Sequence, residues 1–381
     1  MEGGVERHVA NLSKQLVLRG HDVEVFTCAR TRQGDLLERS SMVEGLRVSR
    51  FDSYMSLGEF GKVWPGFAPR VLKGGYDVVH SHSFRHPHTD VSLVASKFSR
   101  SASVLTSHSP FHPAEVRGPF ARALVPVYDN LVAPTTLGLY DKVISLTTEE
   151  ASQLERIGAR PKRTVIIPHG IDDIHFQPAD ASLFTRKFGL EGKRFLLCLS
   201  RINKTKGLDV LLEAFARLAP EAKDVSLVLA GGCTSEREQE FLFKLRARSE
   251  ALGIEDRVVF TGRLSEEEKS SAYEGCLAFV LPSIYEPFGI VLLEAAAHGK
   301  PLVSTRAGGP LSIISEGING LLVAPGDSDQ LYRVLARIVS DEAGAETMGS
   351  NARVFAKKHT WESVAASTER AYLSVARKGN R

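Results

Sequence analysis

The sequence predicts an α/β protein built from two doubly wound domains that face each other across a cleft. The length of 381 residues exceeds the size at which one hydrophobic core stops growing. The second half alternates short apolar runs with helical periodicity, and the first half repeats this alternation less regularly. Continuous apolar strands separated by helices are typical of a parallel sheet that is covered on both faces.

The expected strands follow this alternation along both halves. In the first half they lie at 22–27, 46–51, 76–82, 103–108, 141–146 and 164–170. In the second half they lie at 195–199, 225–230, 257–262, 277–281, 301–305 and 320–325. A polar, proline-bearing segment at 171–181 is expected to connect the halves. We therefore expect a first domain at 1–178, a second at 179–359, and a last helix at 360–381 that packs back across the junction.

The start of the chain departs from this plan. Gly3 and Gly4 lead directly into an amphipathic helix, whereas a doubly wound domain normally begins with a strand. The first strand of the first domain is therefore apparently missing, and its loss would expose the edges of its neighbours. We expect the natural start to lie upstream of Met1.

Composition narrows the classes of partner and compartment. Lys and Arg number 48 against 45 Asp and Glu, so nucleic acid is not an expected partner. No apolar stretch is long enough to span a bilayer and no signal peptide opens the chain, which indicates a cytoplasmic protein. The four scattered cysteines lack CxxC spacing and are expected to be reduced.

A basic loop, SRINKTKG at 200–207, lies between an expected strand and an expected helix. Its cations Arg201, Lys204 and Lys206 would stand beside a helix N-terminus at the carboxyl end of a strand. Both features favour a diphosphate. The alternative is a solvated basic loop.

Two acids bracket the segment EPFGIVLLE. Pro287 suits the first position of a helix and Gly299 its end, so Glu286 would stand at the helix mouth and Glu294 inside it. On one helix they would lie roughly 12 Å apart, too far to share a proton, but suited to grip one elongated ligand. The alternative is a capping acid followed by a surface acid.

Histidines gather in the first half of the chain, and they admit more than one interpretation. His80, His82, His86 and His88 could suggest zinc, but carboxylate partners are sparse nearby. For His80, His86 and His88, a structural role as hydrogen-bonded side chains is an equal alternative. His108 ends an expected strand and is the better candidate for contact with a substrate. The acids of 327–329 form a DxD pattern, which we interpret as a helix N-cap.

Together, SRINKTKG, EPFGIVLLE, PHGID at 168–172 and GGVERHV at the start resemble glycosyltransferase family 4. This family, also described as glycosyl transferases group 1, comprises retaining sugar-nucleotide transferases of GT-B fold. The resemblance implies transfer of a hexose from a UDP- or GDP-type sugar to a glycan or lipid-linked acceptor hydroxyl, without a metal or cofactor.

For the donor, the resemblance implies that Glu286 holds sugar hydroxyls and takes part in catalysis, and that Glu294 holds the ribose. Arg201 and Lys206 would hold the diphosphate.

Further donor contacts are implied at two places. Arg263 and Leu264 of TGRL would lie beside the nucleobase, and the backbone of Phe288, Gly289 and Ile290 would contribute at the helix mouth.

For the reacting centre, the resemblance implies that His108 is a catalytic residue near the transferred sugar. Gly3 and Gly4 would form the first loop, near acceptor and phosphate.

Three other functions stay open. A sugar-nucleotide epimerase can share the two-domain plan, a metal-dependent hydrolase could use the histidine cluster, and a non-catalytic nucleotide-sugar binder could remain after loss of the first strand. Peripheral contact with the inner membrane face is a further hypothesis, because 60–75 and 116–134 mix basic, aromatic and aliphatic residues. Ordinary packing of these segments is the alternative.

Overall fold

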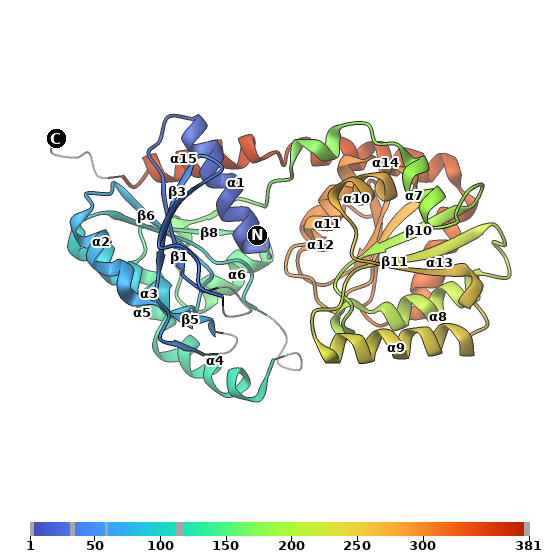
Figure 1. Cartoon of the computed structure of the whole chain (residues 1–381), viewed down its shortest axis with the longest axis horizontal. Helices are drawn as coiled ribbons and strands as arrows, with labels where there is room; N and C mark the ends of the chain where they lie inside the picture. The colour runs from blue at the N-terminus through green and yellow to red at the C-terminus, as the bar shows by residue number, and fades with distance from the viewer. Residues whose placement is uncertain (1–3, 31–34, 58–59, 112–116, 377–381) are drawn as a thin grey trace. The chain divides into compact units, whose positions relative to one another are not determined.

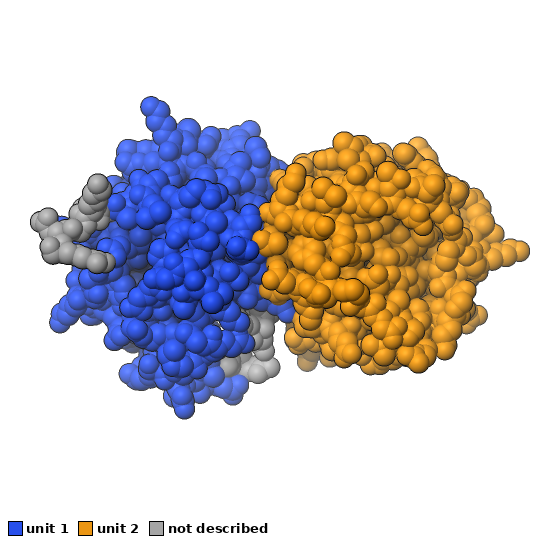
Figure 2. All heavy atoms as spheres, turned by 90° about the horizontal axis from the view of Figure 1, so that it is seen from above, with its two compact units in different colours: residues 1–170, 361–381 blue, residues 171–360 orange. Residues whose placement is uncertain are grey.

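The computed structural model describes residues 4–30, 35–57, 60–111 and 117–376. The chain divides into two compact units, coloured separately in Figure 2. Unit 1 comprises residues 1–170 and 361–381, and unit 2 comprises residues 171–360. The expected connection at 171–181 therefore falls within unit 2, and the domain limits expected from the sequence stay a prediction.

Unit 2 contains one parallel sheet of six strands. Its order is β12-β11-β10-β13-β14-β15, and every neighbouring pair is parallel. All six strands expected in the second half are confirmed; they are β10 (Arg194–Leu199), β11 (Val225–Ala230), β12 (Val258–Gly262), β13 (Ala278–Leu281), β14 (Leu302–Thr305) and β15 (Gly320–Val323). Every residue of β11, β13, β14 and β15 is buried, because helices cover both faces.

Helices lie on both sides of this sheet, with α8 and α9 on one side and α10 and α11 on the other (Figure 1). They are α7 (Ala181–Lys187), α8 (Leu208–Leu218), α9 (Glu236–Ala251), α10 (Glu266–Gly275), α11 (Ile290–Ala297), α12 (Pro310–Ile313), α13 (Ser328–Ser340) and α14 (Glu342–Ala356), with 3-10 turns η5 (Asp173–Phe176), η6 (Lys204–Lys206) and η7 (Glu255–Arg257). Asp327 caps α13 by accepting a hydrogen bond of 2.8 Å from the Gln330 amide, which confirms the N-cap interpretation of the DxD pattern.

The strand order reverses between β10 and β13. The chain leaves β10 toward β11 on one side and leaves β13 toward β14 on the other. In open parallel sheets a ligand binds beyond the carboxyl ends of the strands at such a reversal, because the two following loops part there. The loops after β10 and β13 are SRINKTKG and the segment that contains EPFG.

Unit 1 holds its main strands in two sheets rather than in one. Parallel strands β6 (Val78–His82), β7 (Ala102–Thr106), β8 (Lys142–Ser145) and β9 (Thr164–Ile166) form the larger sheet. In the other, β1 (Glu24–Cys28) runs parallel to β3 (Leu46–Phe51), whose second neighbour β2 (Ser40–Val43) is antiparallel. Within the described residues no strand joins β1 to β6.

The remaining elements of unit 1 are mostly helical. They are α1 (Gly4–Leu18), α2 (Ala68–Lys73), α3 (Pro87–Ser99), α4 (Pro119–Leu131), α5 (Ala133–Leu139), α6 (Thr148–Arg156) and α15 (Trp361–Leu373), with η2 (Pro65–Phe67), η4 (Pro161–Arg163) and the short strand pair β4 (Met55–Ser56) and β5 (Lys62–Val63). Helix α15 packs on α1, as Figure 1 shows, through a core that includes Leu12, Leu16, Trp361 and Val364.

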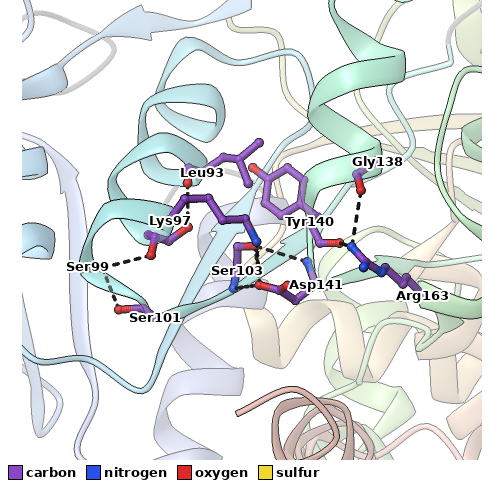
Figure 3. A network of polar contacts seen from close by, with 10 residues as sticks. Leu93, Lys97, Ser99, Ser101, Ser103, Gly138, Tyr140, Asp141 and Arg163 are labelled. Atoms are coloured by element: carbon purple, nitrogen blue, oxygen red, sulfur yellow. Dashed lines mark hydrogen bonds and ion pairs between the residues drawn. The ribbon is translucent and has the colours of Figure 1, made fainter. Parts of the chain in front are cut away.

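A polar network joins α3, β7 and the start of β8 (Figure 3). Asp141 accepts hydrogen bonds from the Lys97 ammonium at 2.8 Å and from the amide and hydroxyl of Ser103, each at 2.9 Å. Nearby, Arg163 donates to the carbonyl oxygens of Gly138 and Tyr140. The bonds of Asp141 tie α3 to β7 and to the start of β8.

Candidate functional site

Lys206 and Glu286 meet at the reversal point of the sheet in unit 2. The Lys206 ammonium lies 2.7 Å from Glu286 Oε2, and the side chains are 14% and 11% exposed. The Ser283 hydroxyl also donates to this carboxylate, at 3.3 Å. The two residues were expected at a site separately, and the structure joins them as an ion pair across the loops that follow β10 and β13.

Local structure fixes the loop that carries Lys206. The Asn203 side chain caps η6 by accepting hydrogen bonds from the amide and hydroxyl of Thr205. Gly207 follows with a φ of +62°, and a Cβ there would overlap the carbonyl oxygen of Pro282. The Ile284 amide donates to the Thr205 carbonyl at 2.8 Å. The basic loop is thus held against the segment that leads to Glu286.

The helix expected to begin at Pro287 begins instead at Ile290. Gly289 precedes it with a φ of +93°, and the Glu286 carbonyl accepts a 2.7 Å hydrogen bond from the Gly309 amide. This pairing holds Glu286 in extended backbone, so the prediction that both acids follow one helix axis was wrong. The predicted end of the helix is confirmed, since α11 ends at Ala297, two residues before Gly299.

A glycine pair that the sequence reasoning missed supports this geometry. Gly308 forms a parallel bridge with Glu286 and has a φ of +73°. A Cβ on Gly309 would overlap the backbone of Phe288, so only glycine allows this close approach. The available signal was the pattern AGGP, one residue after an expected strand, because glycines near the carboxyl end of a buried strand often permit backbone contact.

Glu294 is buried in α11 and contacts side chains of its own unit. The Tyr273 hydroxyl donates to Glu294 Oε2 at 2.8 Å, while His175 Nε2 and Lys269 Nζ lie 3.8 Å and 3.9 Å from its carboxylate oxygens. Burial, and then the charge of Glu294, raise the pKa of Tyr273 well above its ordinary value. Sequence reasoning identified none of these three partners, because they come from segments distant in the chain.

The other expected donor residues lie at strand ends of the same sheet. Arg201 follows β10 and is exposed; Arg263 follows β12 and is exposed, with Leu264 half-buried beside it. The Gly231 amide donates to the Gly262 carbonyl at 2.9 Å, which joins the loops after β11 and β12. Phe288 is buried, at 4% exposure.

In unit 1, His108 stands in a strained loop after β7. Its φ is +58°, and that of Ser109 is +47°, values that favour glycine. The buried carboxylate of Glu150, on α6, braces this loop by accepting hydrogen bonds from the Ser107 hydroxyl and the Ser109 amide. Sequence reasoning missed Glu150, which carries no motif signal.

Other histidines surround His108. His82 Nδ1 lies 3.0 Å from His108 Nε2, and His8 Nδ1 lies 2.8 Å from His169 Nδ1. Burial lowers the pKa of His8, His82 and His108 well below the ordinary value and that of His169 to about 3. These imidazoles are therefore neutral at physiological pH.

The remaining expected residues of unit 1 are placed as follows. His80 bonds to the hydroxyls of Tyr372 and Thr106, which fits the structural interpretation. Gly4 is the first residue of α1, and Gly3 lies outside the described residues.

Comparisons with known proteins identify the family of the chain. Residues 182–355 match the family described as Glycosyl transferases group 1, and residues 2–174 match Glycosyltransferase Family 4. The chain is 31% identical over 399 residues to D-inositol 3-phosphate glycosyltransferase from Geodermatophilus obscurus, covering 98% of this chain and 85% of that protein.

Solved structures show the same fold. HepE from Anabaena, in complex with UDP and glucose, aligns with a TM-score of 0.77 and 23% identity over 98% of this chain and 97% of that chain. WaaG, a glycosyltransferase involved in lipopolysaccharide biosynthesis, aligns with a TM-score of 0.71 and 21% identity over 99% and 97%. The predicted α/β class and GT-B fold are thereby confirmed. The chain belongs to glycosyltransferase family 4, and it is a glycosyltransferase.

Proposed function

We propose that this glycosyltransferase moves a hexose from a nucleotide-diphosphate sugar to an acceptor hydroxyl, with retention at the anomeric carbon and without a metal. The observation that carries the proposal is the Lys206–Glu286 pair at the strand-order reversal of unit 2. The UDP complex of HepE and the name of the inositol phosphate relative support a nucleotide-sugar donor and an acceptor that bears hydroxyls, and the resemblance suggests a donor of UDP or GDP type.

The proposed chemistry needs positive groups that are fixed before the reaction. The bond from the anomeric carbon to the diphosphate oxygen breaks, the bond to the acceptor oxygen forms, and the acceptor proton passes to the leaving diphosphate. Negative charge therefore grows on that diphosphate as the bond breaks. An ammonium has three N–H donors, so Lys206 can keep Glu286 and still bind phosphate. Glu286 would hold sugar hydroxyls, and Arg201 would add a second cation.

The remaining roles are proposals that rest on the resemblance. Arg263 and Leu264 would contact the base, Phe288, Gly289 and Ile290 would contribute backbone groups, and Glu294 would contact the ribose. In unit 1, His108 would contact the transferred sugar, and Gly3 and Gly4 would belong to the acceptor loop.

Nucleotide binding is tested by thermal shift against UDP, GDP and ADP sugars. We expect one nucleotide to raise the melting temperature, since a ligand that binds the folded state stabilises it by mass action. Lys206→Ala and Glu294→Ala should each reduce the shift. Lys204→Ala is the matched control in the same turn: Lys204 is exposed, so its loss should matter less. Equal effects of Lys204→Ala and Lys206→Ala would contradict the assigned role of Lys206.

Stereochemistry and metal dependence are tested with the turning-over enzyme. Product NMR should show the donor's anomeric configuration, and an inverted product would refute retention. Turnover should persist in a chelator, because Lys206 and Arg201 supply positive charge for the diphosphate. If the chelator abolished turnover and added Mg²⁺ restored it, metal independence would be refuted.

Peripheral membrane contact is proposed for α4, at the inner face of the membrane and with the protein in the cytoplasm. The helix exposes Phe120, Leu124, Val127 and Leu131 at 57%, 39%, 51% and 73%. Their spacing places them on one face, as in helices that lie in a lipid interface. A lipid-linked acceptor would suit this face. No helix in the described part of the chain has the length and apolar character needed to cross a bilayer.

The other segment considered for membrane contact, 60–75, is packed in part. Phe67 and Val71 are buried at 3% and 1%, and Arg70 pairs with Glu24 at 2.9 Å.

Vesicle binding tests the proposal for α4. The wild type should bind vesicles that contain anionic lipid, and the double variant Phe120→Ser/Leu131→Ser should not bind them. Phe98→Ser, at an exposed phenylalanine of α3, should bind like the wild type. Absence of binding by the wild type would end this proposal.

A further inference from the structure

Three histidines from separate segments of unit 1 face one another. His8 lies on α1, His82 ends β6, and His108 follows β7. One ring nitrogen from each lies within 4.8 Å of the other two. The ring centroids are 4.9 Å apart for His8 and His108, 5.2 Å for His82 and His108, and 5.6 Å for His8 and His82. The rings thus surround a common point.

A neighbouring histidine orients one of these rings. His8 Nδ1 lies 2.8 Å from His169 Nδ1, which leaves His8 Nε2 for another partner. Hydrogen bonds of this kind orient histidine ligands in metal sites, and their loss commonly weakens metal binding about 10–100-fold.

The neutral imidazoles of this cluster are suited to bind a metal ion rather than a proton. A ring nitrogen of His82 lies 3.0 Å from His108 Nε2 and one of His169 lies 2.8 Å from His8 Nδ1, so imidazoles face one another in this cluster. Neutral imidazole is the form that coordinates transition metals.

We propose that His8, His82 and His108 form a three-histidine site for one transition-metal ion of the Zn²⁺ class. Zinc binds imidazole nitrogen at about 2.0–2.1 Å, which places tetrahedral ligand atoms about 3.3 Å apart. The separation of 3.0 Å between His82 Nδ1 and His108 Nε2 is close to this value, and the 4.8 Å limit requires small ring movements. Three protein ligands leave a fourth position for water or another ligand.

The site would regulate transfer, an inference that rests on the proposed role of His108. A metal bound to His108 would occupy a ring nitrogen of the residue that is proposed to contact the transferred sugar. Zn²⁺ should therefore inhibit transfer, and a chelator should relieve the inhibition. This expectation is compatible with transfer that needs no metal.

Metal binding is measured on the full chain after chelator treatment, without any activity assay. Isothermal titration with Zn²⁺ should give one ion per chain, and Co²⁺ should develop the intense visible bands of a tetrahedral site. His8→Gln and His82→Asn should each weaken binding by at least about 100-fold, beyond the usual effect of an outer-shell change. His359→Gln, at a half-buried histidine of unit 2, is the matched control and should bind like the wild type.

X-ray absorption on the zinc-loaded wild type covers the case in which a variant fails to fold. Nitrogen ligands at about 2.0 Å would support the proposal. Sulfur ligands would place the metal at a cysteine and overturn it, as would absence of binding at micromolar Zn²⁺. If the protein bound zinc but showed no turnover with any donor, the proposed function would be rejected and the proposed metal site would still stand. Turnover that Zn²⁺ leaves unchanged would remove the regulatory role.

Discussion

Glu150 holds the loop of His108 from a helix that has no other part in the site. It is 2% exposed and accepts hydrogen bonds from the Ser107 hydroxyl and the Leu146 amide, each at 2.5 Å, and from the Ser109 amide. Burial raises the pKa of Glu150, while these bonds act in the opposite direction. The strain of two left-handed residues, of order 1–3 kcal/mol each, needs such support.

We therefore predict that Glu150→Gln lowers kcat about 10-fold or more while KM for the donor changes little, because a 1 Å displacement of a reacting group is costly. Gln offers one acceptor oxygen where the carboxylate has two. Steady-state kinetics would test this, with Glu149→Gln on the same helix as the control. Equal losses in both variants, or a pure change in KM, would contradict a positioning role for Glu150.

At the same scale, Glu286 neutralises a half-buried lysine. Glu286→Gln should lower kcat about 100-fold, as for loss of one group that stabilises the transition state. It should also destabilise unit 2 by about 1–3 kcal/mol, because Lys206 loses its charged partner. Kinetics and urea unfolding measure the two effects. The control is Asp329→Asn, which breaks the exposed ion pair with Arg217. It should leave kcat and the stability of unit 2 nearly unchanged.

At the scale of elements, Asp141 joins α3 to β7 and β8. Although burial raises the pKa of this carboxyl, hydrogen bonds from Lys97 and Ser103 lower it below the ordinary value overall. A carboxylate whose folded pKa lies below its unfolded value, about 3.9, adds stability above that pH. The added stability is lost as pH falls through the folded pKa.

Asp141→Asn should consequently destabilise unit 1 by about 1–3 kcal/mol at pH 7, the usual range for hydrogen bonds to a charged group. The difference between variant and wild type should shrink as pH falls below about 4. Urea unfolding at several pH values would show this. Asp52→Asn, in an exposed pair with Arg39, serves as the control and should show a smaller loss at pH 7. A difference that does not vary with pH would contradict the assignment.

At the scale of the whole molecule, unit 1 is completed by the last helix of the chain. Trp361, Val364 and Ala371 of α15 share a core with Leu12 and Leu16 of α1. Arg19 and His21 also reach Glu369 of α15, at 2.5 Å and 2.8 Å. Burial of each large apolar side chain contributes about 1.5–3 kcal/mol, so α1 depends on α15 for much of its stability.

Removal of residues 361–381 should therefore deprotect the amides of α1 in hydrogen exchange. The strands of unit 2 should keep their protection and serve as the internal reference. Trp361→Ala, a milder change, should give a smaller effect in the same direction. Unchanged exchange in α1 after the truncation would show that the shared core does not stabilise it.

The sequence by itself determined most of the secondary structure and the class of fold. Continuous apolar runs such as 225–230 and 301–305 can be satisfied only inside a sheet that is covered on both faces, so their strands could be located directly. Lys206 and Glu286 could be identified because each lies in the loop region that follows such a run. This is where a parallel sheet presents its loops.

The tertiary structure decided which of these groups meet. Lys206 contacts Glu286 because strand order places β10 beside β13, although 80 positions separate the two residues. The true start of α11 depends on Gly309, and the His108 loop depends on Glu150. The local pattern of apolar residues indicates which residues are buried, but contacts between distant segments follow from the order of the strands in the sheet. For this reason the sequence could indicate which residues belong to the site, but only the folded structure could show which of them contact one another.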